Sequence, residues 1–238
     1  MSWNQPSWNQ ASVAAPDIRD ERVSSFLGRV YGWMFAGLLV TALTAFTVAS
    51  SPALIEAVIL NRLVFWVLIF AQLGLVILVS ARVNKIAPSS AAALFMLYSA
   101  LTGVTTAVIL LIYTAASITS TFIITSGMFG AMAVFGSVTK RSLAGLGQFF
   151  FMGLIGLILA SVVGIFWQSD ALQFVISVVG VLVFTGLTAW DAQRLKQMAV
   201  AVPEGRSGSY AVVGALSLYL DFINLFFFLL RFLGGRRN

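Results

Sequence analysis

The 238-residue sequence contains no cysteine and no histidine, and only 9% of its residues are charged. Without cysteine, disulfides, thiol nucleophiles and thiolate metal ligands are excluded. Without histidine, the chain also lacks imidazole ligands, Ser-His-Asp catalysis and the side chain that usually titrates near neutral pH. Any response to protons must therefore come from carboxyl groups.

The sequence consists largely of long apolar segments. Hydrophobic residues make up 60% of the chain and the mean hydropathy is +0.98, whereas a soluble domain has about 25% charged residues. This composition predicts a multi-pass protein whose main partner is the lipid bilayer. The net charge of +6 predicts no nucleic-acid partner, because the basic residues lie at the ends of apolar runs.

Seven apolar segments approach or exceed the ~20 residues that a spanning helix needs. They cover residues 30–49, 63–81, 89–113, 116–138, 148–167, 172–191 and onward, and 211–230. The predicted fold class is therefore all-α, with seven transmembrane helices. Residues 192–210 form the only long connection and are predicted to be a flexible loop. Gly156, Ala160 and Gly164 form a row of small residues that predicts a helix-packing surface.

The chain divides into three predicted parts. Residues 1–16, which repeat Ser-Trp-Asn-Gln, are expected to be a disordered tail. Residues 17–29 are expected to form an interfacial helix, and residues 30–238 a single seven-helix domain. We expect no cleavable signal peptide, because the first apolar run is too long and is followed by further spans.

Basic residues predict the orientation in the membrane. Arg62 lies on one predicted side, and ten basic residues lie on the other, which we therefore expect to be cytoplasmic together with the N-terminus: Arg19, Arg22, Arg29, Arg82, Lys85, Lys140, Arg141, Arg194, Lys196 and Arg206. Three arginines, Arg231, Arg236 and Arg237, follow the seventh segment and would also favour the cytoplasm. They leave a re-entrant hairpin open as an alternative to a full seventh span.

Two acidic residues fall within spans. Asp221 lies in the seventh segment, where an aspartate costs roughly 2.5 to 3.5 kcal/mol to insert. Asp191 ends the sixth segment at a similar predicted depth, and the other six acidic residues lie in the leading segment or in loops. Two carboxyl groups in a medium of low dielectric can share one proton. We therefore predict an Asp191–Asp221 pair that senses pH.

The seventh segment carries its polar residues on one face. Gly214, Ser217, Asp221 and Asn224 follow one another at steps of three and four residues. Such a stripe must face protein or water rather than lipid. We predict that Gly214, Ser217 and Asn224 line a path or contact an ion there.

An alternative keeps the two aspartates apart. Asp191 would lie at the headgroup level and pair with Arg194 or Lys196, while Asp221 stays protonated and bonds Asn224. Arg82, at the end of the second segment, is a third candidate that would pair with an ionised aspartate. Its alternative role is that of a topology anchor whose side chain extends to the headgroups.

The sequence resembles the Bax inhibitor family, the transmembrane BAX inhibitor motif proteins. The motif in residues 214–226 (GALSLYLDFINLF) carries most of this resemblance. It is supported by residues 29–34 (RVYGWM), 95–103 (FMLYSALTG), 125–131 (TSGMFGA) and 186–196 (GLTAWDAQRLK). The composition is typical of a bacterial member, which we expect in the cytoplasmic (inner) membrane.

The resemblance implies a central C-terminal helix surrounded by two three-helix layers. It also implies a pH-sensitive calcium leak channel, with Asp191 and Asp221 as sensor and gate and Arg82 as latch. The sequence around Arg82 departs from the family pattern, which puts the latch in doubt. Calcium would be the transported ion, held weakly and transiently by Asp191 and Asp221, because two carboxylates are too few for tight binding.

Two other function classes remain. The protein would alternatively be a membrane interaction protein that modulates a quality-control membrane protease or a stress response without conducting ions. An intramembrane aspartyl protease is the third reading, but its glycine-aspartate motif is absent, since Trp190 and Leu220 precede the two aspartates. We therefore expect no enzymatic activity and no cofactor.

Overall fold

The computed structural model describes residues 11–167 and 169–237, and within them seven helices are long and apolar enough to cross a membrane. These are α1 (Ala11–Ala49), α3 (Arg62–Ala81), α4 (Pro88–Ile112), α5 (Ala115–Val138), α6 (Ala144–Phe166), α7 (Asp170–Ala201) and α8 (Ser207–Leu233). A short turn α2 (Pro52–Leu54) and a π-helical turn η1 (Ile55–Leu60) connect α1 to α3, and a 3₁₀ turn η2 (Glu204–Arg206) connects α7 to α8. The predicted all-α, seven-helix fold is confirmed.

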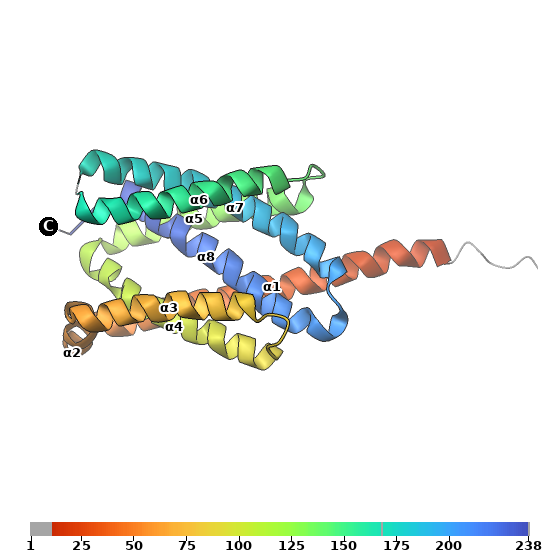
Figure 1. The fold of residues 1–238 in the computed structure, drawn as a ribbon, viewed down its shortest axis with the longest axis horizontal. Helices are drawn as coiled ribbons and strands as arrows, with labels where there is room; N and C mark the ends of the chain where they lie inside the picture. Colours follow the sequence, from red (N-terminus) through yellow and green to blue (C-terminus); the bar gives the residue numbers. More distant parts are fainter. Residues whose placement is uncertain (1–10, 168, 238) are drawn as a thin grey trace, which may run out of the picture.

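Six of the seven helices form two layers around α8, as the resemblance implied. Helices α1, α3 and α4 pack together on one side, and α5, α6 and α7 pack together on the other (Figure 1). Helix α8 crosses the bundle between them and contacts α1, α4, α5 and α7 most extensively. It is also the most buried of the seven candidate spans.

Side chains of α8 explain its central position. Tyr219 is fully buried, and its hydroxyl lies 2.6 Å from the Thr41 Oγ1 of α1. Phe95 and Tyr98 of α4 pack edge-on against the Tyr219 ring. Phe222 packs in the same way against Phe129 of α5. The polar contact satisfies a hydroxyl that lipid could not, so α8 is held inside protein on both sides.

Short side-chain caps define where several helices begin. The Asn61 Oδ1 accepts a hydrogen bond from the backbone N–H of Val64, and the Thr114 Oγ1 accepts one from that of Ser117, both at 3.2 Å. Each cap satisfies an amide that has no partner within its own helix. Both caps lie at the same end of the bundle, where α3 and α5 start.

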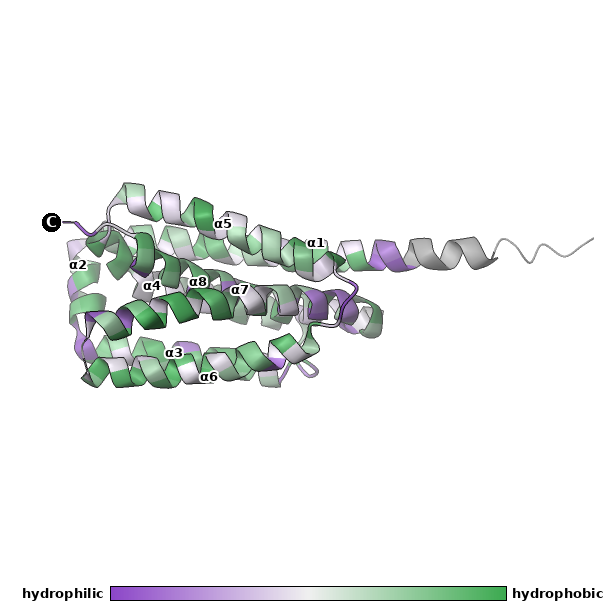
Figure 2. Ribbon diagram, turned by 90° about the horizontal axis from the view of Figure 1, so that it is seen from above, coloured by the Kyte–Doolittle hydropathy of each residue, from purple (hydrophilic) through white to green (hydrophobic). Residues whose placement is uncertain are grey.

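Helix α1 differs from the predicted division near its start. Residues 11–49 form one helix, so residues 17–29 continue the first span directly and are not a separate helix. A 39-residue helix is about 58 Å long at 1.5 Å per residue, well beyond the ~30 Å hydrocarbon core. The excess projects from the bundle (Figures 1 and 2). The predicted tail is helical from Ala11, and residues 1–10 lie outside the described residues.

The predicted long loop is much shorter than expected. Helix α7 continues to Ala201 and α8 starts at Ser207, which leaves only five residues between them. The Ser209 hydroxyl donates to the Ile86 carbonyl at 2.8 Å, and the Tyr210 hydroxyl donates to the Asn84 side chain. These contacts hold the start of α8 on the α3–α4 connection, so residues 207–210 are helical rather than flexible.

The seventh span is one continuous helix, which settles the alternative of a re-entrant hairpin. After α8, the backbone N–H of Arg237 donates to the Ile112 carbonyl at 2.8 Å, and that of Thr114 donates to the Gly235 carbonyl at 3.2 Å. The chain after α8 is thus fixed to the α4–α5 connection, at the end of the bundle opposite the projecting part of α1 (Figure 1). Arg231, Arg236 and Arg237 lie at that end.

The outer surfaces of the layers are apolar. Helices α3 and α6 expose large side chains along their length, among them Phe70 at 64% and Leu159 at 62%. Figure 2 shows hydrophobic residues along the middle of the bundle and hydrophilic ones near its two ends. Exposed apolar surface of this extent is typical of helices that face lipid.

Candidate functional site

The two intramembrane aspartates come from adjacent helices. Asp191 lies ten residues before the end of α7, about 15 Å along the helix, and Asp221 lies fourteen residues after the start of α8, about 21 Å. Because α7 runs on to Ala201 and α8 starts at Ser207, both residues lie deeper in their helices than the sequence suggested. The antiparallel packing of α7 and α8 brings them to the same level.

The carboxyl groups of Asp191 and Asp221 lie within hydrogen-bonding contact of each other. Such a contact requires a proton on one of them, because two carboxylates at this separation repel. One oxygen of Asp221, Oδ2, is buried and accepts no hydrogen bond from a donor in the described structure. An unpartnered buried oxygen costs less on a neutral acid than on a carboxylate. The arrangement therefore suits a pair that holds one proton.

Arg194 is the cation that meets this pair. Its Nη1 lies 3.9 Å from the Asp191 Oδ1, one helical turn away on α7. The Arg194 side chain is 55% exposed and that of Asp191 is 13% exposed, so solvent screens the attraction and the pair contributes little to stability. Its position nevertheless favours the negative charge on Asp191 rather than on the enclosed Asp221, which is 5% exposed.

Trp190 sets the orientation of Arg194. The Arg194 guanidinium lies over the Trp190 ring, 5.7 Å from its centroid. The ring in turn lies flat against α6 at Gly147, where an added Cβ would come within 2.4 Å of the indole. A glycine is needed there because any side chain would displace the tryptophan. Three helix positions thus cooperate in placing one cation beside Asp191.

A groove of about 610 Å³ opens onto the aspartates between α3 and α6. Its walls are mainly apolar, but polar side chains gather on the inner side: Gln72, Tyr98, Asp191, Arg194, Ser217, Asp221 and Asn224. The Gln72 amide donates to the Leu68 carbonyl at 3.1 Å, and its Oε1 accepts a hydrogen bond from the Thr102 hydroxyl at 3.3 Å. The polar surface therefore continues from the pair onto α3 and α4.

The other residues expected on this wall divide into two groups. Ser217 and Asn224 line the groove as expected, although the Asn224 amide donates to the Leu220 carbonyl at 2.8 Å and not to Asp221. Gly214 does not line it. An added Cβ at Gly214 would lie 2.4 Å from the Leu195 Cδ2, so this glycine serves the close approach of α7 to α8.

Arg82 lies apart from the aspartates in this structure. It is the exposed residue that ends α3, where its backbone N–H donates to the Leu78 carbonyl at 3.1 Å. Its side chain is not part of the groove lining. Among the described residues, the Arg82 side chain forms neither an ion pair nor a hydrogen bond. The latch therefore remains a prediction for a different conformation.

The site offers few ligands for a metal ion. Across residues 11–167 and 169–237 no group of three or more acidic, histidine or cysteine side chains is gathered in one place. A cation at Asp191 and Asp221 would meet two carboxyl groups and the neutral oxygens of the groove. Calcium prefers six to eight oxygen ligands, so this set fits brief contact with a passing ion rather than storage.

Gln72, Trp190 and Gly147 belong to the site but were not predicted from the sequence as site residues. A glutamine in the middle of an otherwise apolar span was the signal available for Gln72, since such a residue is costly to place against lipid. Trp190 and Gly147 gave no comparable signal, because tryptophan and glycine are both common in membrane helices for other reasons.

Comparison with known proteins shows to which family the chain belongs. Residues 23–238 match the family model described as "Inhibitor of apoptosis-promoting Bax1". The chain is 49% identical over 218 residues to the inner membrane protein YbhL of Escherichia coli K12, a match that covers 90% of this chain and 93% of that protein. It is 40% identical over 220 residues to the uncharacterized protein RP147 of Rickettsia prowazekii, covering 92% and 93% of the two chains. The chain therefore belongs to the Bax inhibitor family, as its motifs indicated.

Proposed function

We propose that this protein is a pH-sensitive passive leak path for calcium or other cations in the bacterial inner membrane. The observation that carries the proposal is the contact of the Asp191 and Asp221 carboxyl groups between two packed membrane helices. The location follows from the seven apolar helices and from the name of the E. coli relative. The excess of basic residues at the end with the α1 projection supports a cytoplasmic N-terminus.

The proposed gate works through one proton. With the proton shared, Asp191 and Asp221 attract each other and hold α7 against α8. Loss of the proton leaves two negative charges in contact, and their repulsion drives the helices apart at this level. Flux should therefore increase as the pH rises through the titration of the pair.

The groove beside the aspartate pair also supports the proposal. It leaves open space beside the pair, and Gln72, Ser217 and Asn224 supply neutral oxygens there. A cation on this surface would exchange water for weak oxygen ligands and leave again, as conduction requires. Arg194 would turn from Asp191 when a cation arrives, since both compete for the same carboxylate.

The experiment compares calcium flux in liposomes containing the wild type or Asp221→Asn over a series of pH values. Asparagine keeps the size of the side chain but cannot ionise, so we expect its flux to lose the pH dependence of the wild type. Asp170→Asn is the matched control, because Asp170 is an exposed acid at the far end of α7. Flux with the same pH dependence in all three proteins would contradict the proposed gate.

A further inference from the structure

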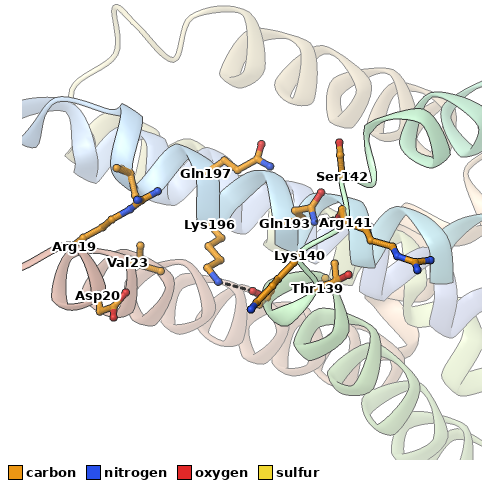
Figure 3. A pocket seen from close by; sticks show the side chains of 13 residues that line it. Arg19, Asp20, Val23, Thr139, Lys140, Arg141, Ser142, Gln193, Lys196 and Gln197 are labelled. Atoms are coloured by element: carbon orange, nitrogen blue, oxygen red, sulfur yellow. Dashed lines mark hydrogen bonds between the residues drawn. The ribbon is translucent and has the colours of Figure 1, made fainter. Parts of the chain in front are cut away.

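A second cavity among the described residues lies away from the aspartates, beside the projecting part of α1. It has a volume of about 890 Å³ (Figure 3). Three elements enclose it: α1 through Arg19, Asp20 and Val23, the α5–α6 connection, and the last turns of α7. We refer to it as the basic pocket.

The charge of the basic pocket is strongly one-sided. Four cationic side chains line it, Arg19, Lys140, Arg141 and Lys196, against the single carboxylate of Asp20. Figure 3 shows Arg19 on α1, Lys196 on α7 and Lys140 on the α5–α6 connection, while the Arg141 side chain extends away from the other three. Cations gathered this way repel one another unless an anion lies between them. The pocket is therefore suited to a ligand with at least one negative charge.

The walls of the pocket are fixed by internal hydrogen bonds. The Gln193 side chain is 8% exposed, donates to the Arg141 carbonyl at 2.8 Å and accepts from the backbone N–H of Leu143 at 2.8 Å. Lys196 donates one proton of its ammonium group to the Ser137 carbonyl, also at 2.8 Å, and keeps two others available. The connection between α5 and α6 is thus held in place on α7.

Two of the cations have no such structural role. Arg19 and Lys140 are exposed, and within the described residues neither side chain has an ion-pair or hydrogen-bond partner. Their donors are free to meet a ligand. An oxyanion such as phosphate accepts several charge-assisted hydrogen bonds at once, which matches donors that converge from two or three directions.

Exposed apolar residues at the same end of α5 favour a lipid as the source of the anion. On α5, Val134, Phe135 and Val138 are 64%, 52% and 70% exposed. Val138 lies between two pocket residues, Ser137 and Thr139. The exposed apolar residues of α5 and the basic pocket therefore lie at the same end of this helix. A molecule with a negative head and long apolar chains fits both surfaces, whereas a soluble anion would use only the first.

We propose that the basic pocket binds the phosphate of an anionic phospholipid, with the acyl chains lying along α5. The phosphate lies among Arg19, Lys140 and Lys196, and Arg141 adds to the positive field. The bound lipid links the projecting part of α1 to the α5–α6 connection. This inference does not depend on ion conduction.

The test measures lipid binding to the purified full-length protein by native mass spectrometry, with phosphatidylglycerol and phosphatidylcholine as probes. We expect the wild type to prefer phosphatidylglycerol and the double variant Arg19→Gln/Lys140→Gln to bind it about 30-fold more weakly, since each basic residue contributes roughly a factor of five. Lys196→Gln is a second variant that should weaken binding in the same direction.

Two controls separate the pocket from general charge. Lys85→Gln/Arg206→Gln removes two exposed cations outside the pocket and should bind phosphatidylglycerol as the wild type does. Arg19→Lys/Lys140→Arg keeps the charge and should retain the preference. Equal phosphatidylglycerol binding by the wild type and Arg19→Gln/Lys140→Gln would overturn the proposal. So would glycerol 3-phosphate binding as tightly as the lipid, because the site would then serve a soluble phosphate.

Discussion

At the scale of single residues, the cation beside Asp191 determines how the pair responds to protons. Arg194 lies 3.9 Å from that carboxylate and is held over Trp190. The alternative considered from the sequence, Asp191 paired with Arg194, and the predicted contact of the two aspartates are therefore both present in one structure. They are compatible because Asp191 lies between its two neighbours.

Replacing Arg194 tests this arrangement. The positive charge favours the ionised form of the pair, so its removal in Arg194→Gln favours the protonated form. If the proposed gate is correct, the increase of calcium flux should move to higher pH in the variant. Flux in liposomes over the same pH series measures the shift.

Arg194→Lys serves as the control, because it keeps the charge while losing the flat contact with Trp190. We expect its flux profile to lie between those of the wild type and Arg194→Gln. A profile for Arg194→Gln identical to that of the wild type would show that the pair is not sensitive to this cation.

The residues of the site differ in how far sequence could predict them. Asp191 and Asp221 were identified because a carboxylate within an apolar span is costly and needs a partner. Their contact is present in the structure, while their roles as sensor and gate remain predictions. Arg194 was only an alternative, since spacing along one helix cannot tell which of several cations turns toward a carboxylate. Gly214 was misplaced because a helix face shows which residues align, not which neighbour covers them.

At the scale of helices, close contact between α5 and α7 depends on Gly136. A Cβ added there would lie 2.0 Å from the Ala189 carbonyl oxygen, which belongs to the backbone and cannot rotate away. Ala189 is two residues before Asp191, so this contact also sets the position of the aspartate relative to α5. The two helices must separate if the glycine is replaced.

Gly136→Ala is therefore expected to destabilise the protein by about 1 to 3 kcal/mol, the usual range for overpacking. Gly130→Ala is the matched control on the same helix, because no atom lies within 4 Å of its added Cβ. That change should leave stability equal or slightly higher, since alanine is the better helix former. Thermal unfolding of both variants in detergent measures the difference, and equal melting temperatures would contradict the predicted contact.

The row of Gly156, Ala160 and Gly164 shows why helix contacts were harder to predict than helices. The row predicted a packing surface. Gly164 does pack against α7, where an added Cβ would lie 3.1 Å from the Gln173 Nε2, and Ala160 packs against the core, but nothing lies within 4 Å of a Cβ at Gly156. The tightest contacts of α6 use Gly147 against Trp190 and Phe150 against Gly186. Apolar length alone defined the spans, whereas the side of a helix that faces lipid depends on helices far away in the sequence.

At the scale of the whole molecule, the two ends of the bundle differ in charge and in structure. The projecting part of α1, the basic pocket and the α7–α8 connection share one end. The turns α2 and η1 and the segment after α8 share the other. With α8 a complete crossing, these two ends lie on opposite sides of the membrane.

The absence of native cysteine makes the orientation directly testable. Ser50 and Ser142 are both exposed, at opposite ends of the bundle. In spheroplasts, a membrane-impermeant maleimide should label Ser50→Cys at once and Ser142→Cys only after permeabilisation, if the N-terminus is cytoplasmic. Labelling in the reverse order would show that the protein is inserted the other way.

The central position of α8 also shapes how the protein is made. Because a chain is synthesised from its N-terminus, six outer helices enter the membrane before the helix that fills the space between them. Until then, Asp191 lacks the carboxyl group of Asp221. The nascent protein therefore passes through a stage in which Asp191 lies in the bilayer without this partner. Insertion of α8 ends this stage, so assembly of the bundle and formation of the aspartate pair are the same event.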